Sequence, residues 1–211
     1  ISYIILHWTL RLSVKAEGAS IAKITRPSAA GIFPRKRLFR LLDTCRKYPV
    51  IWISGPAGSG KTTLVSSYLD ANELPCLWYQ VDEGDSDIAT FFSYMGMAAR
   101  KAAPRKRTLL PLLTPEYLQG IPTFTLRYFE NLFNRLTIPF VLVFDNYHSV
   151  SPNSNFHSMI SDGLSTLPDG MNIIISRHDL PPALSKMHAN GLMGMLTWDE
   201  LRLSLEEAVG I

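Results

Sequence analysis

Residues Gly55–Thr62 read G-P-A-G-S-G-K-T, which matches the whole spacing of a loop that cradles the phosphate groups of a nucleotide. Glycines allow such a loop to turn tightly and to bring its backbone N–H groups against phosphate oxygens. In this arrangement the Lys61 ammonium contacts the β- and γ-phosphates, and the Thr62 hydroxyl is a hard oxygen ligand for Mg²⁺. The sequence therefore predicts a site for a nucleoside triphosphate with Mg²⁺. The residues expected to contact the nucleotide are Gly55, Pro56, Ala57, Gly58, Ser59, Gly60, Lys61, Thr62 and Thr63.

A nucleotide site of this kind also needs an acidic side chain at the tip of another buried strand. Asp145 follows the apolar run Phe140–Phe144 and is predicted to hold Mg²⁺, directly or through a water. Arg177 ends the next apolar run, and ligands of open α/β sheets lie at such strand ends. A guanidinium there can contact the γ-phosphate and stabilise charge during phosphoryl transfer. The alternatives are an Asp145 that caps a turn and an Arg177 in a surface salt bridge.

Strands and helices must alternate along the chain to position these side chains. Apolar runs predict strands at Tyr48–Ser54, Cys76–Val81, Pro139–Phe144 and Met171–Ile175. Helices are expected at Lys61–Asp70, Ile88–Ala99, Phe124–Leu136, Phe156–Leu167 and Pro181–Asn190. Thr114, Pro115 and Glu116 predict one more helix start, and Gly120 and Pro122 are expected to end that helix. The alternation predicts an α/β fold, a three-layer sandwich with a mostly parallel sheet and helices on both faces.

Composition narrows the functional classes. The 211 residues are 46% apolar, which is ordinary for a globular protein and enough for one large domain. The net charge is +3, from 21 basic and 18 acidic residues, so charge alone does not make the chain a nucleic-acid binder. The basic clusters Arg35–Arg37 and Arg100–Arg107 are expected to be solvated. Cys45 and Cys76 have no metal-binding spacing and are expected to be buried, reduced thiols of a cytoplasmic protein.

The two ends of the chain stand apart from the predicted domain at residues 23–203. Residues 1–22 form an unassigned N-terminal extension, whose apolar stretch Ile1–Val14 is too short to span a membrane. It also lacks the small-residue cleavage site of a signal peptide. Ser204 and Glu207 form a capping box that opens a helix at residues 204–211. This helix is expected to be the truncated start of a following domain in a longer protein.

Several segments together resemble the regulatory ATPase domain of the large LuxR-type transcription activators of the maltose-regulon kind, which are signal-transduction ATPases with numerous domains. Beside the phosphate loop, these segments are Lys23–Pro27, Arg35–Leu38, Trp78–Asp85, Leu142–His148, Ser176–Pro181 and Leu205–Ala208. The resemblance implies a P-loop NTPase fold with a five-stranded sheet in the order 5-1-4-3-2, and ATP as the nucleotide. It also implies that Arg177 lies beside the γ-phosphate, and that Arg26, Pro27 and Arg35 lie near the base or sugar.

The same resemblance implies a molecular switch. In this family the ATP-bound protein is the active, self-associating form, and hydrolysis resets it. DNA is contacted through domains that would follow Ile211, so this chain itself is expected to contact neither DNA nor a membrane.

One position departs from the family pattern, because Asn146 stands where a second acidic residue is common. A carboxylate can orient or deprotonate the attacking water, whereas an amide is a very poor base. Glu83 or Asp82, after the predicted strand Cys76–Val81, is the expected substitute, and hydrolysis is expected to be slow. The catalytic candidates are Lys61, Asp145, Asn146, Arg177 and Glu83, and the expected metal ligands are Thr62 and Asp145.

Three further side chains have a structural interpretation beside a functional one. The favoured interpretation of His148 is a histidine whose hydrogen bonds are satisfied within its loop. The alternative is a contact with the nucleotide or with a neighbouring subunit. Trp78 and Tyr79 are read as core aromatics rather than as a platform for a base.

Four functions compete on these residues. The leading one is a slow Mg-ATPase switch of a transcription regulator, and the second is an ATP-sensing module without turnover, which Asn146 favours. A small-molecule kinase would use Arg100, Arg105 and Arg107 as a lid over its substrate. The fourth is a fragment that does not fold alone.

Overall fold

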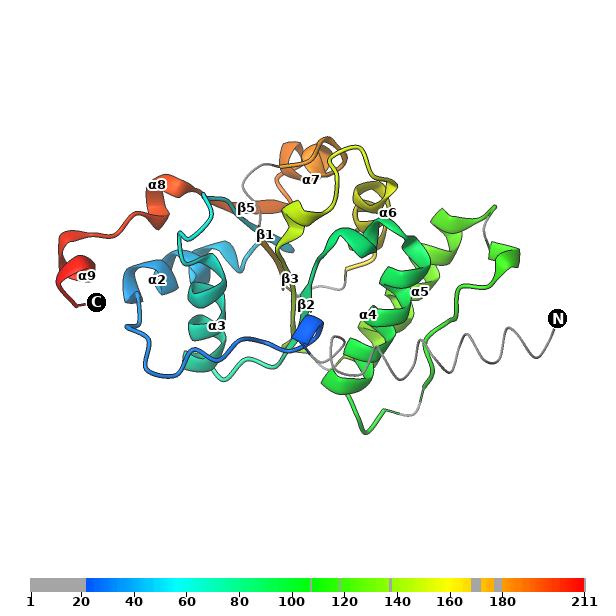
Figure 1. The fold of residues 1–211 in the computed structure, drawn as a ribbon, viewed down its shortest axis with the longest axis horizontal. Coiled ribbons are helices and arrows are strands. Elements are labelled where there is room, and N and C mark those ends of the chain that lie inside the picture. The colour runs from blue at the N-terminus through cyan, green and yellow to red at the C-terminus, as the bar shows by residue number, and fades with distance from the viewer. Residues whose placement is uncertain are drawn as a thin grey trace.

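The computed structural model describes residues 22–106, 108–117, 119–136, 138–167, 172–176 and 180–210. The predicted N-terminal extension lies outside the described residues except for Ala22, and Arg177 lies outside them as well. In the part that is described, five parallel strands form one sheet between two layers of helices (Figure 1). The predicted three-layer α/β sandwich is confirmed.

The strands are β1 (Val50–Ile53), β2 (Cys76–Gln80), β3 (Val141–Asp145), β4 (Asn172–Ser176) and β5 (Met193–Leu196). They lie in the order β2-β3-β4-β1-β5, which confirms the expected order, and each neighbouring pair is parallel. Ile53 pairs with both Ser176 and Leu196, and Gln80 pairs with Asp145. The carboxyl ends of the strands therefore meet along one edge of the sheet.

Helices lie in the connections between these strands, before β1 and after β5. They are α2 (Lys36–Cys45), α3 (Lys61–Ala71), α4 (Ile88–Ala102), α5 (Ile121–Arg135), α6 (Asn155–Leu164), α7 (Ser185–Ala189), α8 (Trp198–Leu201) and α9 (Leu205–Gly210). Short 3₁₀ turns are η1 (Glu83–Ser86), η2 (Pro115–Tyr117), η3 (Tyr147–Ser149) and η4 (Pro182–Leu184). The expected helix from Thr114 is only the turn η2, and Pro122 lies in the first turn of α5 instead of ending a helix. Proline suits that place because the first helical N–H groups have no partner within the helix.

Alternate residues of the strands face two separate cores. Val50 and Trp52 of β1 pack with α4, α5 and α6, whereas Ile51 and Ile53 pack with α2 and α3. Trp78 and Tyr79 follow the same rule, since they are 3% and 0% exposed and lie in opposite cores. Both are core side chains, as expected of strands that are buried on both faces.

Gly163 of α6 shows how closely the helices of one layer pack. A Cβ atom added there would lie 2.5 Å from the ring of Phe129 on α5. We expect Gly163→Ala to lower the free energy of unfolding by about 1–3 kcal/mol, because the ring must move. The control is Gly96→Ala in α4, where the nearest atom would be 3.5 Å away. Urea unfolding of both variants measures the difference, and equal stabilities would contradict this packing.

Two smaller expectations are also tested. Cys45 and Cys76 are both free thiols and half-buried rather than fully buried. Burial raises the pKa of each thiol. Across the described residues, no helix combines the length and the apolar character needed to cross a membrane.

Candidate nucleotide-binding site

The phosphate loop connects β1 to α3. Its glycines are required for two different physical reasons. Gly58 and Gly60 have φ values of +76° and +78°, a left-handed conformation in which a side chain would be strained. Gly55 is needed for a close approach, because an added Cβ would lie 2.9 Å from Leu201 Cδ1. The loop thus turns sharply into the first turn of α3, whose unpaired N–H groups favour an anion.

Lys61, the first residue of α3, bends back over the loop. Its Nζ donates hydrogen bonds to the carbonyl oxygens of Gly55 at 2.7 Å and Pro56 at 2.8 Å, and to Ser59 Oγ at 3.2 Å. Burial lowers the pKa of Lys61, and the nearby Asp145 carboxyl opposes that shift. The ammonium is therefore held above the loop by three hydrogen-bond acceptors of the loop itself.

Thr62 and Asp145 meet although 83 residues separate them in the sequence. The Thr62 hydroxyl donates to Asp145 Oδ1 at 3.0 Å, and the backbone N–H of Asn146 donates to the same oxygen at 2.9 Å. Asp145 is only 4% exposed. Burial raises its pKa, against the opposing effects of these two hydrogen bonds and of the Lys61 and His148 charges. Two hard oxygen ligands side by side fit the magnesium ion that the sequence predicts.

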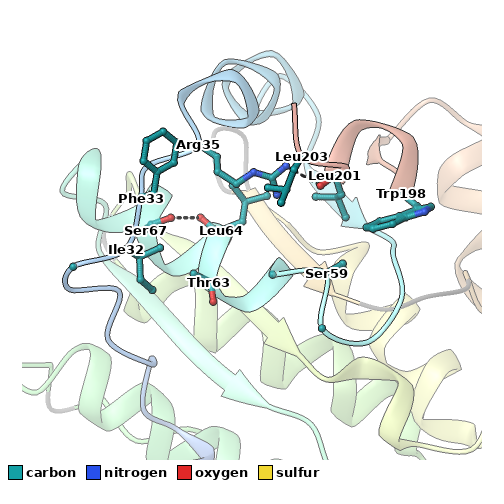
Figure 2. Close-up of a pocket in the computed structure, with 13 residues that line it drawn as sticks. Ile32, Phe33, Arg35, Ser59, Thr63, Leu64, Ser67, Trp198, Leu201 and Leu203 are labelled. Carbon is teal, nitrogen blue, oxygen red and sulfur yellow. Dashed lines mark hydrogen bonds between the residues drawn. The ribbon is translucent and has the colours of Figure 1, made fainter. Parts of the chain in front are cut away.

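A cavity of about 580 Å³ opens beside the phosphate loop. Figure 2 shows Ile32 and Phe33 on one side and Trp198, Leu201 and Leu203 on the other. The complete lining is Gly31, Ile32, Phe33, Arg35, Gly58, Ser59, Gly60, Thr63, Leu64, Ser67, Trp198, Leu201 and Leu203. An apolar cavity with a few polar groups at its edge is typical of a small-molecule site.

The five apolar side chains on the two sides of this cavity were not predicted from the sequence. Four of them are large apolar residues exposed by more than a third, namely Ile32 at 40%, Phe33 at 39%, Trp198 at 38% and Leu203 at 52%. Exposed apolar side chains that gather on one surface are the signal for such a cavity lining, but this signal needs the structure.

The arginines expected near the base or sugar separate in the structure. Arg35 lines the cavity, and its guanidinium donates to the carbonyl oxygen of Leu201 at 2.7 Å. Arg26 instead forms an ion pair with Asp70, nine residues beyond Lys61 and thus about 14 Å along α3. Pro27 also lies against α3, where its carbonyl oxygen accepts from Ser66 Oγ. The structure therefore brings Arg35 to the site but not Arg26 or Pro27.

The candidate groups for water activation lie along the carboxyl edge of the sheet. Asn146 directly follows β3, is half-buried, and has a left-handed φ of +55°. Glu83 is exposed in η1, three residues after Gln80, the strand partner of Asp145. Asp82 is engaged elsewhere, since it accepts from the Gly84 amide at 2.9 Å and pairs with Lys23 at 2.6 Å.

Two other predicted groups are placed only in part. His148 is exposed in η3, and its charge acts on the Asp145 carboxyl. Arg177 lies outside the described residues, directly after Ser176 of β4. β4 itself runs between β1 and β3, as the resemblance implied.

The arginines proposed as a kinase lid lie at the opposite end of the strands from the phosphate loop, as far as the structure describes them. Arg105 lines a surface hollow together with Pro75 and Phe140. Pro75 directly precedes β2, and Phe140 directly precedes β3. This hollow is therefore at the amino ends of the strands, whereas the phosphate loop is at their carboxyl ends. Arg100 lies in the last turn of α4, close to the same end, and Arg107 is outside the described residues. The structure gives the kinase alternative no support.

Comparisons with known proteins agree with this geometry. No family model matches the chain. HTH-type transcriptional regulators MalT from Cronobacter sakazakii and Klebsiella pneumoniae are 31% identical over 150 residues, a match that covers 70% of this chain and 16% of each relative. The chain thus spans only a small part of the length of these relatives.

A solved structure, the Walker-type ATPase of Pyrococcus abyssi, matches with a TM-score of 0.52 at 18% identity. The match covers 82% of this chain and 55% of the other, and it shows the fold. The chain is thus a P-loop NTPase-fold protein that is homologous to the MalT-type transcription regulators.

Proposed function

We propose that the chain binds ATP with Mg²⁺ and hydrolyses it slowly, as the switch domain of a transcriptional regulator. The observation that carries the proposal is the Thr62–Asp145 pair at 3.0 Å, directly beside Lys61 and the phosphate loop. Bound magnesium would neutralise charge on the β- and γ-phosphates. Thr62 and Asp145 are the residues that would hold it.

The shape of the site supports a place for the rest of the nucleotide. In this proposal the backbone N–H groups of Gly55–Thr63, apart from Pro56, which has none, would donate to the phosphates. The Lys61 ammonium, which lies over the loop, would contact the β- and γ-phosphates. The apolar cavity between Phe33 and Trp198 suits a purine base, with Arg35 at its edge. The choice of adenine follows the family resemblance of the sequence segments, and the solved structure of similar fold is that of a Walker-type ATPase.

The regulatory part of the proposal concerns segments around this domain. We assign residues 23–203 to the P-loop domain and 204–211 to the start of a following one, and we leave 1–22 unassigned. ATP binding would favour self-association, and DNA would be contacted only through other domains. The relatives are transcriptional regulators, so we place the protein in the cytoplasm.

Asn146 decides how fast the proposed hydrolysis runs. It follows the magnesium-binding candidate Asp145 directly, where a carboxylate could accept a proton from water and an amide cannot. We expect purified protein to release phosphate from Mg–ATP over hours, and Asn146→Asp to release it at least severalfold faster. Single-turnover assays with radiolabelled ATP measure both rates.

The control for this prediction is Asp145→Asn, which removes the proposed magnesium ligand and should abolish the slow reaction. Protein that binds ATP but releases no phosphate over hours would instead be the ATP-sensing module without turnover. Unchanged rates in Asn146→Asp would exclude this position as the cause of slow turnover. The same assay tests Arg177. The substitution Arg177→Ala is expected to slow phosphate release.

A further inference from the structure

Two arginines, Arg35 and Arg37, hold residues 200–207 beside the cavity at the phosphate loop. Arg35 Nη2 donates to the carbonyl oxygens of Leu201 at 2.7 Å and Arg202 at 3.0 Å. The same guanidinium binds Glu207 Oε2 through Nη2 at 3.0 Å and Nε at 3.2 Å. The side chains of Arg35 and Glu207 are 11% and 7% exposed, so this ion pair is largely shielded from solvent.

Arg37, two residues further along in the first turn of α2, binds the same segment. It donates to the carbonyl oxygens of Glu200 at 2.9 Å and Arg202 at 2.8 Å, and to Glu207 Oε2 at 3.2 Å. The Ser204 amide also donates to Glu207 Oε2 at 3.0 Å, which completes the capping box expected from the sequence. We call Arg35, Arg37 and Glu207 the arginine clasp.

The same segment supplies one wall of the cavity. Trp198, Leu201 and Leu203 line it (Figure 2). All three lie within two positions of a residue whose carbonyl oxygen Arg35 or Arg37 binds. Leu201 also packs over the phosphate loop, where its Cδ1 atom leaves no room for a side chain at Gly55. A shift of the backbone of residues 200–202 away from α2 would stretch the hydrogen bonds that Arg35 and Arg37 make to it.

The charge of Glu207 stabilises the arginine clasp. Burial raises the pKa of Glu207, but its hydrogen bonds with Arg35, the Ser204 amide and Arg37 outweigh burial, so this pKa lies below its usual value. Glu207 is therefore a carboxylate at neutral pH and carries the charge that both guanidinium groups need. Charged hydrogen bonds of this kind are about twice as strong as neutral ones.

We propose that the arginine clasp positions Trp198, Leu201 and Leu203 as the wall that holds the nucleobase. Glu207, which does not line the cavity, thereby acts as a positioning residue for nucleotide affinity. This inference rests on the proposed function, because it assumes that the cavity holds the base of the bound nucleotide. By thermodynamic linkage, the bound base would stabilise the closed clasp to the same degree.

The test compares Glu207→Gln with Glu206→Gln, its exposed neighbour, in the full chain. Calorimetric titrations measure the affinities for Mg–ATP and for inorganic triphosphate, which has phosphates but no base. We expect Glu207→Gln to weaken Mg–ATP by about fivefold, a typical coupling between sites, and to leave triphosphate unchanged. Glu206→Gln should change neither affinity.

A double mutant shows whether the clasp acts through the wall. Trp198→Ala should cause the same selective loss of ATP affinity, and Glu207→Gln should add little in that background, because residues that act as one unit are not additive. Independent, additive losses would overturn the proposal. Arg37→Lys, which keeps the charge but loses the planar fork, is the second variant if Glu207→Gln does not fold.

The remaining outcomes separate this inference from the proposed function. Equal ATP affinity in Glu207→Gln and the unchanged protein would overturn the clasp and leave ATP binding intact. Equal losses for ATP and triphosphate would show a general structural role and would also overturn it. If the unchanged protein bound neither ligand, the proposed function itself would fail.

Discussion

Lys61→Ala is expected to weaken the binding of Mg–ATP by about tenfold or more, which corresponds to a loss of about 1.4 kcal/mol or more. The Lys61 ammonium lies 2.7 Å and 2.8 Å from two carbonyl oxygens of the phosphate loop, so it is held in place before a nucleotide arrives. Alanine removes the cation while keeping a good helix former at the start of α3. The loss should therefore come from phosphate binding and not from unfolding.

The matched control is Lys186→Ala, which removes the same charge from the exposed face of α7. Calorimetric titration with Mg–ATP should give an unchanged affinity for this control. Equal affinities of Lys61→Ala and the unchanged protein would mean that phosphates are not held by this loop. A cooperative thermal transition in both variants would exclude the fourth possibility, a chain that does not fold by itself.

The local parts of the site were predictable because their signals are short. The loop requires glycine where φ is positive, and two of its glycines, Gly58 and Gly60, have that conformation. The run Phe140–Phe144 reads as a strand buried on both faces, which fixes Asp145 at its tip. The strand order came from the family resemblance, since apolar runs by themselves do not say which strands are neighbours.

The long-range parts of the site were not predictable from these patterns. Arg26 was expected near the nucleotide, but the direction of its side chain depends on Asp70 at the other end of α3. Phe33 and Trp198 line one cavity although 165 positions separate them, and neither has a periodic pattern around it. Glu207 could be read as half of a capping box, but its ion pair with Arg35 spans 172 positions. Contacts of this kind appear only once the sheet has brought the segments together.

Lys23→Met is expected to lower the free energy of unfolding by about 3–5 kcal/mol, the usual cost of removing one partner from a buried ion pair. Lys23 is 7% exposed and pairs with Asp85 at 2.8 Å, and Asp85 is fully buried. Its ammonium also lies 5.2 Å from the ring centre of Tyr79 and 5.1 Å from that of Tyr94. Methionine keeps most of the side-chain volume, so the expected loss is electrostatic.

Urea unfolding at several pH values tests this prediction most directly. Burial raises the pKa of Asp85, and the hydrogen bonds from Lys23 and Tyr79 oppose that shift. Without Lys23 the pKa of Asp85 should rise further, and a raised carboxyl pKa means that the folded state gains stability as the pH falls below it. The penalty should therefore be largest at neutral pH and should shrink in acid.

A second substitution separates the buried charge from packing. Asp85→Asn in the Lys23→Met background removes the unpaired carboxylate, and the amide can still accept from the Tyr79 hydroxyl, which lies 2.6 Å from Asp85. This double variant should recover much of the lost stability at neutral pH, because an unpaired buried charge costs more than a hydrogen-bonded neutral group. If the double variant were as unstable as the single one, the loss would come from the packing of Lys23 against the two tyrosine rings. The charge pair at the end of β2 would then contribute little to holding residues 23–26 on the domain.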